Sequence, residues 1–196
     1  MLAHGGPRGA AVALESAVRQ SELKERLDAL YRQYDHRFVD PDPLQFVRAQ
    51  TEDEDREVVG MVASALAFGN VATIKNSIAA VLEVLGPRPA QAVRRLDPGE
   101  AARRLRGFKH RWSDGRDVAC LLFLLRQMLE SHGSVEAFFG AGMALGAEDV
   151  GPSLASFSAR ALALDHGGLY RGRRLPGAAG VRYFFPSPRT AARASG

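Results

Sequence analysis

The sequence has a single cysteine, few lysines and no long apolar run. Cys120 alone cannot supply a disulfide framework, a cysteine-based zinc site or a cysteine-ligated iron–sulfur cluster within one chain. No apolar run reaches the ~18 residues of a membrane-spanning helix, and the first 20 residues lack the compact apolar segment of a secretory signal. We therefore expect a soluble, cytoplasmic protein with no membrane partner, and the sequence indicates no metal ion or cofactor.

Positive charge is concentrated in the later part of the chain. Residues 1–60 carry a net charge of −4 and residues 61–196 a net charge of +8, within a total of +4. Nearly all of the basic residues are arginine, which, together with frequent alanine and glycine, is typical of a GC-rich genome. The basic part permits a polyanionic partner, although it does not indicate that each arginine contacts a phosphate.

Helical periodicity and capping signals recur along the chain and predict an all-α fold. We expect a disordered leader over residues 1–20, a helical domain over residues 21–188 and an unstructured tail over residues 189–196. The one stretch of period-2 alternation is Val181 to Phe185. The predicted helices lie at about 21–35, 44–48, 51–68, 71–85, 89–95, 98–106, 114–132, 135–139 and 152–165.

Several polar residues that resemble catalytic groups have a simpler structural interpretation. The acidic cluster from Glu52 to Glu57 follows Thr51 and is predicted to form a capping box and to be solvated, rather than to act as a catalyst. None of the five histidines pairs with another histidine or a carboxylate at ligand spacing. Cys120 lies in an apolar helix and is expected to be buried and inert.

The segment from Arg103 to Arg116 combines positive charge with aromatic rings. Basic side chains beside aromatic rings, in a loop between helices, can hold phosphates and stack on bases. The alternative is a solvated basic loop whose two aromatic residues fill the core. The candidate nucleic-acid contacts in this segment are Phe108, Lys109, His110, Arg111 and Trp112.

Asn70 is a further candidate contact, because it lies in the break between two apolar helices. Its amide either faces a groove or belongs to a left-handed helix C-cap, a conformation that asparagine tolerates. Leu175 to Gly180 is similar to the turn of a DNA-binding hairpin, but it has one residue too many between its glycines. We interpret that segment as an ordinary loop.

Three motifs resemble a widespread bacterial family of uncharacterised proteins, a domain of unknown function. They are the run from Asp53 to Ile74 with its Ala-Phe-Gly-Asn, the Gly-Phe-Lys-His-Arg from Gly107, and the run from Gly180 to Pro188. The resemblance covers about residues 30–188. It implies an all-α, DNA-binding fold similar to the helix-hairpin-helix DNA glycosylases, incomplete at its C-terminal end in this chain.

The resemblance also implies that the family continues with Asp-Gly-Ser-Ala-Cys-Lys-Arg-Leu-Asn and later Leu-Asp-Thr-His-Val. GC-rich codons for the first of these segments, read one base out of frame, give Thr-Ala-Ala-Arg-Ala-Ser-Gly and a stop, which is residues 190–196. We hypothesise that one base was lost near the Arg189 codon. Absence of Leu-Asp-Thr-His-Val from the next ~100 codons of the other frame would refute this.

Two functions remain open from the sequence. The first is a nucleic-acid-binding, DNA glycosylase-like protein, with DNA or RNA as partner, that is catalytically inactive as this chain. It would lack catalysis because neither the aspartate nor the lysine that base excision uses falls in a matching motif. The second is a helical scaffold that binds other proteins and has no nucleic-acid role.

Overall fold

The structure is a computed structural model that describes residues 7–34, 42–143, 146 and 149–188. The chain separates into two units, residues 1–40 and 41–196, which are described separately. The tail predicted over residues 189–196 lies outside the described residues. Within them, no helix is both long and apolar enough to cross a membrane.

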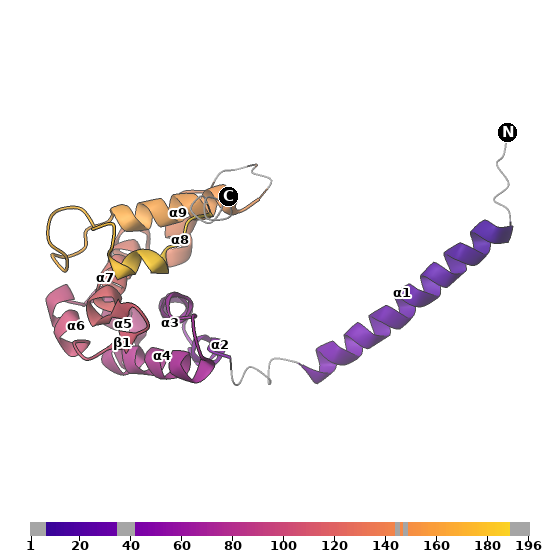
Figure 1. Cartoon of the computed structure of the whole chain (residues 1–196), viewed down its shortest axis with the longest axis horizontal. Helices are drawn as coiled ribbons and strands as arrows, with labels where there is room; N and C mark the ends of the chain where they lie inside the picture. Colours follow the sequence, from indigo (N-terminus) through magenta and orange to yellow (C-terminus); the bar gives the residue numbers. More distant parts are fainter. Residues whose placement is uncertain (1–6, 35–41, 144–145, 147–148, 189–196) are drawn as a thin grey trace. The chain divides into compact units, whose positions relative to one another are not determined.

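The first unit contains one long helix, α1 (Pro7–Gln33). A helix start at Ser21 was expected, with a disordered leader over residues 1–20, whereas α1 begins at Pro7 (Figure 1). Alanine, the strongest helix former, recurs before Ser21, and proline is favoured in a first helical turn. Nothing local therefore interrupts the helix at Ser21.

In the second unit, α2 (Leu44–Arg48) has the predicted bounds, and α3 (Asp53–Ala65) begins later and ends earlier than predicted. The expected capping box at Thr51 is wrong, because the N-cap of α3 is Glu52 and no side chain caps it. The helix ends before Gly69, which has a φ of 115° and takes the left-handed conformation that reverses the chain.

Two acidic residues of α3, Asp55 and Glu57, cap other helices instead of their own. The Asp55 carboxylate accepts a hydrogen bond from the backbone N–H of Ala90 at 2.8 Å, in the first turn of α5 (Pro89–Arg94). The Glu57 carboxylate accepts from the N–H groups of Val135 and Glu136, in the first turn of α8 (Val135–Gly140). The expected solvation is wrong for Asp55, which is only 3% exposed, because its carboxylate is used inside the protein to cap α5.

The next helices follow their local signals closely. α4 (Val71–Leu85) has the predicted bounds and ends at Gly86, whose φ is 75°. α6 (Pro98–Arg104) begins at a proline and is capped by Asp97, whose carboxylate accepts from the N–H of Glu100 at 2.7 Å. Capping residues thus mark these helix ends reliably.

A two-stranded hairpin interrupts the helices, and it is the only sheet among the described residues. β1 (Lys109–His110) and β2 (Ser113–Asp114) pair antiparallel, with His110 opposite Ser113. The prediction of a loop here was wrong in this respect, because strands of two residues are too short for alternation to be seen in the sequence.

α7 (Gly115–His132) is the central helix of this unit and is buried along most of its length. Asp114 and Asp117 form a reciprocal capping box at its start. α9 (Gly151–Ala163) follows α8, and η2 (Gly180–Phe184), a 3₁₀ helix, lies beside α9 (Figure 1). The period-2 alternation of Val181 to Phe185 does not form a strand, because most of this stretch lies in η2. The predominantly helical class is confirmed.

Candidate nucleic-acid interface

Three aromatic rings from distant parts of the sequence meet at the hairpin. The Trp112 ring stacks on the Phe68 ring, with 4.7 Å between centroids and 6° between planes. The Tyr183 ring, from η2, lies 5.5 Å from Trp112 at 59°. Trp112 is 51% exposed and Tyr183 63% exposed. We call Phe68, Trp112 and Tyr183 the aromatic ladder.

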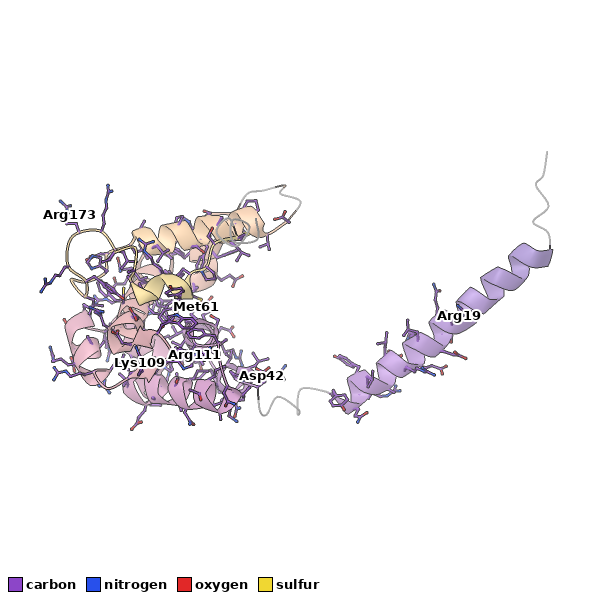
Figure 2. All side chains as sticks on the ribbon, in the orientation of Figure 1. Arg19, Asp42, Met61, Lys109, Arg111 and Arg173 are labelled. Carbon is purple, nitrogen blue, oxygen red and sulfur yellow. The ribbon has the colours of Figure 1, made fainter. Side chains whose placement is uncertain are left out.

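Arg111 adds a positive charge to the ladder. Its guanidinium carbon lies 5.6 Å from the centre of the Trp112 ring, within the range of a cation–π contact. Its side chain also passes over Gly69, where an added Cβ would lie 3.7 Å from Arg111 Cδ. Lys109 is exposed on β1 of the same hairpin (Figure 2).

The backbone of Arg111 is in an unfavourable conformation. Its φ of 56° is the only positive value among the described residues other than glycine. Arg111 is the first of the two turn residues between His110 and Ser113, a position at which a positive φ favours glycine. A residue held in such a conformation at an exposed site suggests that its side chain has a functional role.

His110 is buried, whereas its predicted role was direct contact with nucleic acid. Its side chain is only 1% exposed. Nε2 lies 3.1 Å from the Phe68 carbonyl oxygen, which can only accept, so Nε2 donates. Nδ1 then accepts from the Ser77 hydroxyl at 2.9 Å. The imidazole therefore offers no surface to a ligand, and it positions Phe68 relative to the hairpin.

Asn70 and Phe108 both have structural contacts. Asn70 is the N-cap of α4, where its side-chain oxygen accepts from the N–H of Ala72 at 2.9 Å. Its φ is −76°, so the left-handed C-cap alternative is wrong, and Gly69 takes that conformation. The Asn70 side chain remains exposed beside the turn. Phe108 is half-buried against the core and lines a shallow groove with Val84.

Sequence reasoning missed two members of the ladder, Phe68 and Tyr183. Both lie inside the motifs of the resemblance, but neither was singled out as a contact. Tyr183 lies in the one stretch of period-2 alternation, a pattern that would send alternate side chains of a strand to opposite faces. In the 3₁₀ helix, Tyr183 is exposed at the ladder while Val181 and Phe184 are buried.

The loop between α9 and η2 carries a second group of positive charges. Arg171, Arg173 and Arg174 are exposed, and Arg173 projects outward (Figure 2). Leu175 to Ala179 forms a turn closed by a hydrogen bond from Ala179 to Pro176, which agrees with the expected ordinary loop. This loop precedes η2 directly, so the same segment carries Tyr183 and these arginines.

The buried polar groups near α7 are poorly suited to catalysis. Burial, followed by the negative charges of Asp117 and Asp165, raises the pKa of the Cys120 thiol from 9.0 to about 12. Burial and a hydrogen bond to Asp117 raise the pKa of Tyr170. A thiol and a phenol held neutral at physiological pH are weak nucleophiles. The structure brings together no three potential metal-ligating side chains among the described residues.

Comparison with known proteins assigns a family but no activity. The family model described as "Protein of unknown function (DUF2400)" matches residues 42–192, which is most of the chain. No curated protein and no solved structure is significantly similar to the chain. The matched region contains the hairpin, all three rings of the ladder and the arginine loop.

Proposed function

We propose that this chain, which belongs to the DUF2400 family of proteins of unknown function, binds nucleic acid through the aromatic ladder and the cations around it. The observation that carries the proposal is the position of Trp112. A large ring, stacked on Phe68 and still half exposed beside a guanidinium, is an arrangement suited to base stacking. The unfavourable backbone of Arg111 supports a role for that side chain in binding.

Positive charge on the hairpin and on the loop before η2 supports a polyanionic ligand. Arg111 and Lys109 lie on the hairpin, and the exposed arginines 171, 173 and 174 lie on the loop that leads to Tyr183. Such side chains contact phosphates, while aromatic rings contact bases. We assign the phosphate contacts to Arg111 and Lys109, and the base contacts to Trp112. Asn70 is exposed at the turn beside Phe68 and adds a polar group at the edge of the ladder.

The proposal for this chain is that it binds nucleic acid but does not catalyse base excision. The resemblance to helix-hairpin-helix DNA glycosylases supports a related, DNA-binding fold for the family. Base excision requires an aspartate that stabilises positive charge on the sugar and, in some enzymes, a nucleophilic lysine. Lys24, Lys75 and Lys109 do not lie in the matching motif. The proposal therefore gives Lys109 a phosphate contact and assigns it no nucleophilic role.

Fluorescence of the only tryptophan, Trp112, tests the proposal directly. An oligonucleotide whose bases stack on the indole should quench its emission, and the association constant should fall as salt rises. Loss of one phosphate contact in Arg111→Gln should reduce the slope of log K against log salt by about 0.7 to 0.9. Binding by Trp112→Ala, followed through a labelled oligonucleotide, should weaken without a change in slope.

The matched control is Tyr31→Ala, which removes an 80% exposed aromatic ring from α1 in the first unit. Its affinity for the oligonucleotide should equal that of the unmodified chain. Undetectable binding of both single-stranded and duplex DNA and RNA at low salt would overturn the proposal. In that case the alternative, a helical scaffold for another protein, would be favoured.

A further inference from the structure

The apolar groove between α9 and η2 continues the surface of the aromatic ladder. It has a volume of about 560 Å³, and its lining includes Ala159 and Leu162 from α9, and Tyr183 and Phe185 at η2. Tyr183 thus belongs to both the ladder and the groove. Phe185 is buried and packs against Phe157 at 6.0 Å between centroids, which gives the groove a firm aromatic base.

The geometry points to single-stranded nucleic acid as the ligand, with unpaired bases stacked on the ladder and the next base held in this groove. The inference rests on the proposed function and narrows it to one substrate class. In a duplex, both faces of each base are covered by neighbouring pairs, so protein rings can stack only on ends or unpaired bases. Trp112 and Tyr183, which are 51% and 63% exposed, therefore suit a strand whose bases are free.

The charge around the groove fits the same ligand. None of the described residues that line the groove is acidic, and Arg182 lies at its edge. Arg182 is held there, because its Nε donates to the Pro176 carbonyl and its Nη2 to the Leu175 carbonyl, each at 2.8 Å. The three exposed arginines of the α9–η2 loop precede this turn. An apolar floor with a cationic edge matches a base attached to a phosphate backbone.

The experiment compares three ligands of about 12 nucleotides, a length within the range that such surfaces cover: oligothymidine, an abasic strand of equal charge, and a duplex. With the full chain, oligothymidine should quench Trp112, and the abasic strand should bind more weakly and quench little. The duplex should bind at least about fivefold more weakly than oligothymidine, since it withholds the faces of its bases. Equal affinity for duplex and single strand would overturn the inference, while the proposed function would stand.

Occupation of the groove is tested by filling it. Ala159→Phe places a ring in the groove from an exposed position on α9, and Ala163→Phe places the same ring on an exposed part of the same helix that does not line the groove. Oligothymidine affinity should fall about fivefold or more in Ala159→Phe and remain unchanged in Ala163→Phe.

Each other outcome has a definite meaning. Unchanged affinity of Ala159→Phe for oligothymidine would show that no base enters the groove and would overturn this part of the inference. The groove would then be a candidate binding site for a protein segment. Absence of binding by all three ligands would overturn the proposed function together with the inference. Before binding is measured, circular dichroism is used to check that Ala159→Phe keeps its helical content. If the variant is unfolded, Leu162→Gln, which alters the groove without enlarging a side chain, replaces it with the same expected loss.

Discussion

The imidazole of His110 links the hairpin to the turn before α4, because its Nε2 donates to the carbonyl oxygen of Phe68 at 3.1 Å. The two rings also meet edge to face, with 4.8 Å between centroids. Phe68 in turn carries the stacked Trp112. A buried residue with no access to a ligand therefore determines where the exposed ring of the ladder lies.

We expect His110→Ala to weaken oligonucleotide binding although His110 touches no ligand. The variant leaves the Phe68 carbonyl and the Ser77 hydroxyl without partners and opens a cavity, at a cost of about 2–4 kcal/mol in the free energy of unfolding. Urea unfolding measures this cost. Because no phosphate contact is lost, the salt dependence of binding should keep its slope, whereas Lys109→Ala should lower it by about 0.7 to 0.9. Unchanged affinity in a folded His110→Ala variant would show that the link is not needed for binding.

Arg111→Gly should weaken oligonucleotide binding without lowering the stability of the fold. Glycine adopts the positive φ of this turn without a Cβ conflict, so folding should be unaffected or stabilised by up to about 1 kcal/mol. Loss of the guanidinium should weaken oligonucleotide binding and flatten its salt dependence. Thermal unfolding and a salt titration measure the two effects. The control Arg111→Lys keeps the charge and should retain most of the salt slope; equal binding by the glycine and lysine variants would contradict the role of this charge.

Local signals explain how much of the fold could be predicted. The helices predicted at about 98–106 and 135–139 begin directly after Asp97 and Ser134, whose side chains cap them, and α4 ends at Gly86. Each of these features depends on a few adjacent residues. Contacts between residues far apart in the sequence were not predicted. For example, Glu57 caps α8, which begins 78 residues later.

The candidate site was predicted in part for the same reason. The sequence indicated a basic and aromatic segment, and Trp112 and Arg111 are indeed exposed there. It could not indicate that Tyr183 meets Trp112, or that His110 is buried while its neighbours are exposed. These two features depend on how η2 and α4 pack against the hairpin. A two-residue strand is too short to show a periodicity from which that packing could be predicted.

Gly180→Ala should destabilise the second unit strongly. A Cβ at this position would lie far inside van der Waals contact with the buried carboxylate of Asp117. That carboxylate is fixed by Tyr170 and by the N–H of Asp114, so it cannot move without losing hydrogen bonds. We expect a loss of about 2–4 kcal/mol in urea unfolding. Gly177→Ala, where an added Cβ meets nothing within 4 Å, is the control and should change little.

Glu57→Ala should destabilise the start of α8. The carboxylate accepts from the N–H groups of Val135 and Glu136 at 2.8 and 3.0 Å, and the variant leaves both groups without this partner. A loss of about 1–2 kcal/mol is expected from urea unfolding, with Glu57→Gln losing less because one acceptor remains. Glu52→Ala serves as the control, since the side chain at that N-cap makes no capping hydrogen bond. A similar loss in both alanine variants would indicate a general charge effect instead.

Cys120 should make the protein less stable as pH rises from about 9 to about 12. In this window the unfolded thiol loses its proton, while burial holds the folded pKa near 12, so the unfolded state binds fewer protons. Burial and the hydrogen bond to Asp117 raise the pKa of Tyr170 and act in the same direction. Cys120→Ala should therefore flatten part of the decline in urea unfolding. A thiol reagent should also label Cys120 at pH 8 only after unfolding, and rapid labelling of the folded chain would contradict its burial.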